Sequence, residues 1–304
     1  MPDKRFAQVH RFIDPLRVEP GKRVRLGKDF DPRYAADFVK KEDATEALRE
    51  GVEWLAELQV KLIAQHATSL LVIFQGMDAA GKDGTIGHVL SGVNPQGVEV
   101  TSFKVPSPVE ADHDFLWRAG LHLPGRGMIG IFNRSYYEET LVVRVHPEIL
   151  AGQKIPASSK GKDIWQRRFR EINDWERYLT DNGTKIVKLF LNVSREEQKG
   201  RFLDRIEEPN SNWKFNAGDA RERRYWDAYQ GAYADMLTHT STPWAPWHVI
   251  PADRKWFMRL AAASVVLDAL MEIDPQYPVP TPETKAAMLA AKEELLAEGA
   301  AKTA

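Results

Sequence analysis

The sequence predicts an α/β protein in which a parallel sheet is covered by helices on both faces, a three-layer α/β/α sandwich. Short apolar runs alternate along the chain with longer segments of helical periodicity, an alternation typical of parallel sheets. A glycine-rich stretch, GMDAAGKDGT at residues 76–85, directly follows the first of these runs. Because ligands of such folds bind beyond the carboxyl ends of the strands, this stretch marks the first candidate site.

The composition is that of one large domain or two small ones. The chain has 304 residues, of which 43% are apolar and 28% are charged, and its formal net charge is −1. Such a nearly neutral chain gives no overall reason to expect binding to nucleic acid or to an anionic membrane. The absence of cysteine excludes disulfides and thiolate chemistry. No transmembrane run or secretory signal is evident, so we expect a cytoplasmic enzyme.

The first half of the chain begins with an irregular segment. Residues 1–42 are rich in proline, glycine and charge, and we expect a surface arm there. Apolar residues then recur at helical spacing over 43–66, behind a capping-box pattern that starts at Asp43. The other elements predicted in this half are a strand at 69–75, a helix after the glycine-rich loop, a strand at 98–103 and a helix at 112–121.

The second half continues the alternation of strands and helices. Ser194 and Asp219 have side chains that accept hydrogen bonds from amides, so we expect each to cap a helix. The main domain is expected to span 43–275, and the Ala/Glu/Lys-rich tail at 276–304 is expected to be helical. The predicted elements are strands at 127–135, 185–193 and 247–251, and helices at 162–181, from Ser194, from Asp219 to about 238, and at 253–272.

The glycine-rich loop nearly matches the phosphate-binding pattern G-x-x-x-x-G-K-[ST], but Asp83 stands where a hydroxyl is usual. Its glycines permit backbone conformations that let amide groups converge on phosphate oxygens, and Lys82 would bridge those oxygens. The alternative is a plain turn with a solvated lysine, in which Asp83 only caps the next helix. The predicted phosphate-binding residues are Gly76, Ala79, Ala80, Gly81, Lys82, Asp83 and Gly84.

The missing hydroxyl requires another ligand for magnesium. Asp78 lies inside the loop and is the first candidate, with Thr85 as a weaker one. In phosphate-loop enzymes a second strand end often carries an acid that holds the metal. Here that position is Asn133, a neutral oxygen donor and so a weaker ligand, and Asp78 is therefore expected to be the main protein ligand of magnesium. As an alternative, Asp78 is an ordinary turn aspartate.

Two further segments carry candidate ligand-binding residues. In IFNRSYYEE, at 131–139, Arg134 can contact phosphate or pair with Glu138 or Glu139, and the two tyrosines can pack or stack on a base. Residues 195–224 carry eight lysines and arginines with aromatic residues between them. This segment is expected to close as a lid over phosphate, or else to be a solvated charged helical pair.

Together these stretches resemble the family-2 polyphosphate kinases, a branch of the P-loop kinases. The resemblance covers roughly residues 40–275, and in this family an aspartate after the loop lysine is ordinary. The matching stretches are GMDAAGKDGT, SGVNPQGVEVTSFKVPS at 91–107, IFNRSYYEETLVVRV at 131–145, LFLNVSREEQKGRFLDR at 189–205, WKFNAGDARERRYWDAY at 213–229 and APWHVIPADRKWF at 245–257.

The resemblance implies a P-loop kinase fold with a helical lid at about 195–238. It also implies transfer of the terminal phosphoryl group of inorganic polyphosphate to AMP or ADP, with adenine or guanine bases, helped by Mg²⁺ or Mn²⁺. An acid at Glu138 is similar to the class III branch, which uses both acceptors. The implied catalytic residues are Asp78, Lys82, Arg134 and Arg205; the nucleotide contacts are Asn133, Arg134, Tyr137, Glu138, Arg201 and Arg205; the metal ligands are Asp78 and Asn133.

Three other functions stay open from the sequence. An ATP-dependent nucleoside monophosphate kinase and an ADP-only polyphosphate kinase would share the same loop and lid. A nucleotide-binding switch protein is less compatible with the chain, because no guanine-reading N-K-x-D motif is evident. We also expect a homo-oligomer, either a dimer or a tetramer.

Overall fold

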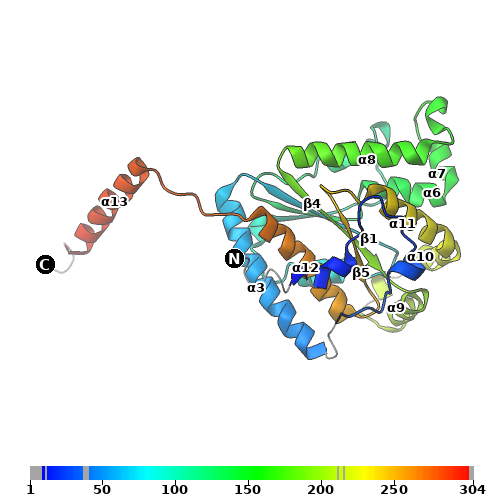
Figure 1. The fold of residues 1–304 in the computed structure, drawn as a ribbon, viewed down its shortest axis with the longest axis horizontal. Coiled ribbons are helices and arrows are strands. Elements are labelled where there is room, and N and C mark those ends of the chain that lie inside the picture. The colour runs from blue at the N-terminus through cyan, green and yellow to red at the C-terminus, as the bar shows by residue number, and fades with distance from the viewer. Residues whose placement is uncertain (1–8, 11, 37–40, 211, 215, 301–304) are drawn as a thin grey trace.

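The computed structural model is built on a five-stranded sheet in which every neighbouring pair of strands is parallel (Figure 1). It describes residues 9–10, 12–36, 41–210, 212–214 and 216–300. The strand order is β2-β3-β1-β4-β5. The parallel sheet is confirmed, and each strand lies close to its predicted position. The strands are β1 (Ser69–Gly76), β2 (Val98–Ser102), β3 (Ile129–Asn133), β4 (Thr184–Asn192) and β5 (Trp247–Pro251).

The central strand β1 shows why helices must cover both faces of the sheet. Alternate side chains of a strand point to opposite faces. Leu70, Val72 and Phe74 therefore join one apolar core, whereas Leu71 and Ile73 join the other. The first core lies under α3 (Lys41–Gln65), α4 (Lys82–Val89) and α12 (Lys255–Ile273), and the second under α8 (Ile164–Asp181) and α11 (Trp226–Thr240) (Figure 1). The three-layer prediction is confirmed.

The sheet register brings the polar segments to one edge. Phe74 in β1 is level with Asn133 in β3, and Gly76 at the end of β1 is level with Leu191 in β4. The glycine-rich loop, the segment after β3 and the helix after β4 therefore begin side by side. The remaining elements are η1 (Asp14–Leu16), α2 (Leu26–Asp29), η2 (Pro95–Gly97), η3 (Glu110–Asp112), α5 (Trp117–Gly120), η4 (Tyr136–Thr140), α6 (Val142–Val145), α7 (Pro147–Gly152), η5 (Ala157–Lys160), α9 (Arg195–Glu207), η6 (Asn212–Lys214), α10 (Ala217–Glu222), η7 (Arg223–Tyr225) and α13 (Pro282–Ala300).

The helix predicted at 112–121 does not form as a unit. A 3₁₀ turn ends at Asp112 and a single helical turn begins at Trp117. Between them the carboxylate of Asp114 accepts a hydrogen bond from the Leu116 amide at 2.9 Å. This local bond competes with the helical pattern, which is the usual effect of aspartate inside a helix.

Two of the three predicted helix caps are wrong. Asp43 lies inside α3, whose described part already begins at Lys41. Asn216, rather than Asp219, caps α10 by accepting a hydrogen bond from the Gly218 amide at 2.8 Å. The helix predicted from Asp219 to about 238 is divided into α10, a 3₁₀ turn and α11. Only the Ser194 cap is confirmed, with its hydroxyl accepting from the Glu197 amide at 3.2 Å.

The N-terminal segment is more than the surface arm that its composition predicts. Leu16, Val18 and Val24 are buried. The Val18 amide donates to the Trp247 carbonyl at 2.9 Å, and Arg17 forms an antiparallel bridge with His248. The described part of this segment therefore covers the outer edge of β5, which an open sheet must protect from pairing with other chains.

The C-terminal tail is helical, as predicted. Helix α13 projects away from the body of the molecule on an extended linker (Figure 1). Its larger apolar side chains, Met288, Leu289, Leu295 and Leu296, are exposed. Among the described residues, no helix has the length and apolar character needed to cross a bilayer.

A buried polar network supports the segment that follows β3. Lys188 and Glu176 have no exposed surface and form an ion pair at 2.6 Å. The Glu176 carboxylate also accepts hydrogen bonds from the hydroxyls of Tyr136 at 2.7 Å and Tyr137 at 2.8 Å. Burial disfavours the charged form of Lys188 and lowers its pKa, which the neighbouring Glu176 opposes. The pair therefore holds η4, and the residues next to it, against the sheet.

Glu176→Ala should lower the free energy of unfolding by about 3–5 kcal/mol, because it leaves the buried Lys188 charge without its partner. Denaturant unfolding followed by circular dichroism measures this. The double variant Glu176→Leu/Lys188→Met removes both charges and should be clearly more stable than the single variant. Equal stability of the two variants would contradict the pairing.

Candidate active site

The loop between β1 and α4 depends on glycine at both of its ends. Gly76 has φ +155°, and a Cβ there would lie 3.0 Å from the Leu191 carbonyl oxygen. Gly81 has φ +105° and caps α4, where a Cβ would lie 3.0 Å from the Met258 methyl carbon. Close packing and left-handed backbone thus exclude larger residues. The positive end of α4 faces whatever the loop encloses.

Lys82 is buried rather than solvated, with only 9% of its surface exposed. Its ammonium donates hydrogen bonds to the carbonyls of Gly76 at 2.6 Å and Met77 at 3.2 Å. An ammonium has three donors, so one is left for a ligand. Burial, and secondarily the Arg134 charge, lower the pKa of Lys82 to about 8, and nearby carboxylates oppose this shift. The burial of Lys82 contradicts the alternative of a plain turn with a solvated lysine.

Arg134 joins the loop to the segment after β3. Its guanidinium pairs with the Asp78 carboxylate and with Glu138 at 3.2 Å. Its own φ is +63°, a left-handed conformation held by the hydrogen bond from its amide to the Phe74 carbonyl at 3.0 Å. Glu138 is the largest cause of a raised pKa at Arg134, so the guanidinium keeps its charge. The structure thus shows the ion pair with Glu138 that was one of the two predicted roles of Arg134, and contact with phosphate stays a prediction.

Asp83 does not cap α4, because Gly81 holds that position. Its carboxylate instead accepts a hydrogen bond from the Asn133 side-chain amide at 2.6 Å. Thr85 is fully buried, and its hydroxyl donates to the Gly81 carbonyl at 2.9 Å, so it is not available as a metal ligand. The unusual aspartate of the loop therefore ties α4 to the end of β3.

The segment predicted as a lid begins with α9 and continues into α11. Helix α11 lies in one of the two helical layers, with Tyr233, Met236 and Leu237 buried in the core. Helix α11 therefore lies outside any lid, and only the stretch from α9 to η7, which ends near Tyr225, stays a candidate for the predicted lid. Within it, the Arg205 guanidinium lies over the Phe202 ring at 5.5 Å and is partly exposed.

Comparison with known proteins gives this site its context. The family described as Polyphosphate kinase 2 (PPK2) matches residues 38–278. The chain belongs to this family. It is 49% identical to the ADP-polyphosphate phosphotransferase of Rhodopseudomonas palustris, over 92% of this chain and 97% of that protein. It is 43% identical to the AMP/ADP-polyphosphate phosphotransferase of Meiothermus ruber, over 87% of this chain and 95% of that protein.

A solved structure supports the same assignment. The crystal structure of polyphosphate kinase 2 from Arthrobacter aurescens matches with a TM-score of 0.82 and 40% identity, over 91% of this chain and 95% of that one. The resemblance of the sequence to family-2 polyphosphate kinases, and the P-loop kinase fold that it implies, are confirmed.

Two residues predicted to contact nucleotide are buried and form hydrogen bonds with other parts of the protein instead. Tyr137 has no exposed surface, and its hydroxyl is bonded to Glu176 and Lys188. It therefore takes the packing role, and the prediction that it contacts a base is wrong for this conformation. Arg201 is only 7% exposed and donates to the loop carbonyls of Ala79 and Ala80 at 3.1 and 2.7 Å. It stabilises the loop from outside, because its guanidinium faces main-chain oxygens.

Two residues that sequence reasoning missed also lie at the site. Asp219 has a raised pKa, caused first by burial and then by the Asp78 charge, whereas Arg205 and Arg134 lower it. The charge of Asp219 is therefore influenced by Asp78 and by both arginines. Gln198 is 1% exposed and donates to the Asp78 carbonyl at 2.8 Å. Both residues lie in stretches that match the family, Asp219 in WKFNAGDARERRYWDAY and Gln198 in LFLNVSREEQKGRFLDR, but nothing in the sequence indicated their contacts.

Magnesium fits the site if substrate oxygens complete its coordination. Among the described residues, no group of three or more histidines or acids could hold a metal by itself. Mg²⁺ is commonly held by one or two carboxylates together with substrate phosphates. Asp78, whose side chain is 26% exposed, supplies such a carboxylate. Asn133 is a poorer candidate, since its amide oxygen is a neutral donor, while its side-chain N–H donates to Asp83.

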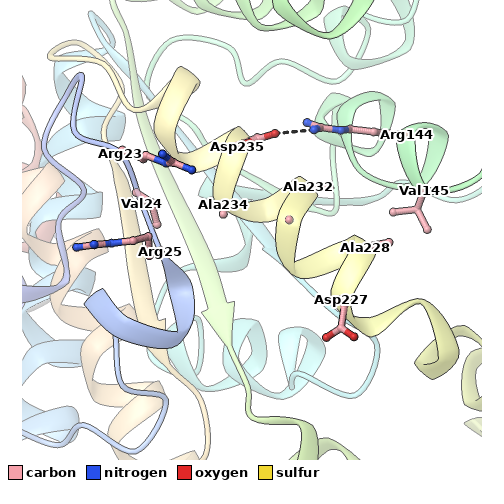
Figure 2. Close-up of a pocket in the computed structure, with 11 residues that line it drawn as sticks. Arg23, Val24, Arg25, Arg144, Val145, Asp227, Ala228, Ala232, Ala234 and Asp235 are labelled. Carbon is pink, nitrogen blue, oxygen red and sulfur yellow. Dashed lines mark hydrogen bonds and ion pairs between the residues drawn. The ribbon is translucent and has the colours of Figure 1, made fainter.

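A surface pocket of about 480 Å³ lies away from this site (Figure 2). Arginines from the N-terminal segment and α6 line it together with acids of α11. Arg144 is paired with Asp235 at 2.5 Å, and Arg25 is paired with Asp29 at 3.0 Å. None of the predicted site residues lines this pocket, and its charges are largely paired, so it is not the phosphate site.

The lowered pKa of Lys82 predicts a pH dependence. In the free enzyme Lys82 loses its proton as the pH rises through about 8, so kcat/KM for the phosphate-rich substrate should fall above that pH. A pH profile of kcat/KM measures this. Lys82→Arg keeps its charge at high pH, so the alkaline limb should move upward even though its activity is lower. An unmoved alkaline limb would assign it to another group.

Proposed function

We propose that the protein transfers the terminal phosphoryl group of inorganic polyphosphate to ADP and AMP, with Mg²⁺, and that the reaction is reversible. The observation that carries this proposal is the convergence of the loop, Lys82 and Arg134 at the carboxyl edge of the sheet. The two curated relatives of similar length are named for phosphotransfer between polyphosphate and ADP or AMP/ADP. Adenine and guanine nucleotides are both proposed as acceptors.

The chain's own residues supply positioning and charge neutralisation, the main catalytic contributions in phosphoryl transfer. The free donor of the Lys82 ammonium and the amide groups at the start of α4 grip the polyphosphate end. An oxygen of the acceptor phosphate forms the new P–O bond. The bond to the penultimate phosphate breaks, and that phosphate leaves with the electron pair. No covalent enzyme intermediate is needed, because the acceptor oxygen is already a nucleophile at neutral pH.

The two arginines would act on the transferring group from opposite sides. Arg134 reaches it from the segment after β3, where Asp78 and Glu138 hold the guanidinium in place. Arg205 reaches it from the lid, and closing the lid excludes water. When bound, Mg²⁺ would neutralise charge on the phosphate oxygens, with Asp78 as its protein ligand.

Incubation of the purified protein with polyphosphate, Mg²⁺ and AMP tests this function, with ADP and ATP followed over time. Formation of ADP and then ATP is expected. A product that stops at ADP would indicate an AMP-specific enzyme, and turnover of ADP alone would indicate the one-step enzyme. A parallel reaction with ATP and AMP but no polyphosphate tests the ATP-dependent kinase, and nucleotide binding without turnover would favour the switch protein.

Arg205→Ala should lower kcat by about 100- to 1000-fold, equivalent to about 3–4 kcal/mol, because it removes a cation from the transition state. Thermal unfolding should change little, since the side chain is partly exposed. Steady-state kinetics with polyphosphate and ADP measure the effect. Unchanged turnover would remove Arg205 from the catalytic residues.

Glu138→Asn should reduce the use of AMP more than that of ADP, by about tenfold or more in the ratio of kcat/KM values. The reason is that an acid at this position is the feature similar to class III enzymes, and its carboxylate holds Arg134 at 3.2 Å. Competition assays with both acceptors measure the ratio. Glu148→Asn, at an exposed glutamate, is the control, and an equal loss with both acceptors would contradict the assignment.

A further inference from the structure

The first lid helix, α9, holds the main chain of the phosphate loop from outside. Gln198 donates from its side-chain amide to the Asp78 carbonyl at 2.8 Å. Arg201 donates to the next two carbonyls, those of Ala79 at 3.1 Å and Ala80 at 2.7 Å. Three successive carbonyls of the loop therefore point towards α9.

This arrangement sets the direction of the loop amides. In a planar trans peptide the N–H of one residue points opposite to the carbonyl of the residue before it. With their carbonyls drawn to α9, the peptides after Asp78, Ala79 and Ala80 turn their N–H groups away from that helix. Ala79 also has φ +59°, a left-handed conformation that a non-glycine residue adopts only when its surroundings hold it there.

The amide of Gln198 has a second partner on the far part of the lid. Its oxygen accepts a hydrogen bond from the Arg223 guanidinium at 2.6 Å. Arg223 also donates to the Arg195 carbonyl at 3.1 Å. One buried side chain thus joins the loop peptide at Asp78 to η7, which lies beyond α10 in the chain.

Gln198 and Arg201 differ in what they connect. Arg201 bonds to the loop, to Glu197 on its own helix and to the Ala252 carbonyl after β5, so it ties the loop to the body of the protein. Gln198 connects the same loop to Arg223 in η7, at the end of the proposed lid. A shift of Arg223 therefore reaches the loop through Gln198.

We infer that Gln198 is a positioning residue that couples lid closure to the orientation of the Asp78–Ala79 peptide. The inference rests on the proposed function. When Arg223 is docked, the Gln198 amide is fixed at both ends and holds this peptide, and with it the Asp78 carboxylate, in the geometry needed for transfer. By linkage, phosphate that binds to the ordered loop favours the docked lid in return.

Substitutions can separate the two ends of this connection. Gln198→Met keeps the size of the side chain and removes both hydrogen bonds. Gln198→Glu keeps an acceptor for Arg223 but loses the donor to the Asp78 carbonyl. Arg223→Met removes only the lid end. Gln166→Met and Arg170→Met, the same changes at exposed positions of α8, are matched controls and should behave like the wild type.

Polyphosphate-dependent turnover of ADP is measured for each variant, with thermal unfolding as the test of folding. Gln198→Met, Gln198→Glu and Arg223→Met should each lower kcat by about 10- to 100-fold, with a smaller change in KM, because a misplaced loop affects transfer more than binding. Adding Arg223→Met to Gln198→Met should lower kcat by less than about twofold more, since the connection is already cut.

Independent effects that multiply in the double variant, or full activity of Gln198→Glu, would overturn the inference. If Gln198→Met does not fold, Gln198→Glu and Arg223→Met carry the test. Hydrogen exchange gives a second readout. Tripolyphosphate with Mg²⁺ should protect amides of residues 217–225 in the wild type but not in Gln198→Glu, and equal protection would also overturn it. Wild-type turnover in the same assay tests the proposed function separately.

Discussion

The site depends on the hydrogen bonds that hold the main chain of the phosphate loop from outside. A loop that turns its amides towards an anion must turn carbonyls the other way, and buried carbonyls need donors. Arg201 and Gln198 supply these donors from α9, and Lys82 supplies two more on the inner side. The loop can therefore remain in a conformation that includes a left-handed alanine, and its shape does not have to be created by the substrate.

The second feature of the site is its balance of charge. Lys82 is buried deeply enough that its pKa falls, yet the carboxylates around it oppose that change. Arg134 lies between Asp78 and Glu138, so its positive charge has two acids beside it. Such preorganisation reduces the rearrangement needed when charge develops on the transferring phosphoryl group. The buried pair of Glu176 and Lys188 holds η4, the segment that follows Arg134, through hydrogen bonds to Tyr136 and Tyr137.

The sequence predicted the elements whose signals are local and strong. Strands β1 and β4 are buried on both faces, and continuous apolar runs mark them. The helix predicted at 112–121 does not form as a unit, because a single aspartate side chain changes the backbone pattern there. The N-terminal segment was misjudged because its apolar residues are scattered among charges, and burial of such residues depends on the open edge of β5.

The sequence by itself determined the loop, the parallel sheet and the family, because glycine spacing, apolar runs and long ordered motifs are properties of neighbouring residues. Only the tertiary structure decided which polar side chains of these motifs are bonded to other parts of the protein. Tyr137 and Arg201 lie within motifs that match the family, yet one is bonded to Glu176 and the other to loop carbonyls. Gln198 also lies within such a motif, but the sequence gives no sign of its partners. The physical reason is that a hydrogen bond across the fold joins residues far apart in the chain, such as Gln198 and Asp78, and only folding brings them within 2.8 Å.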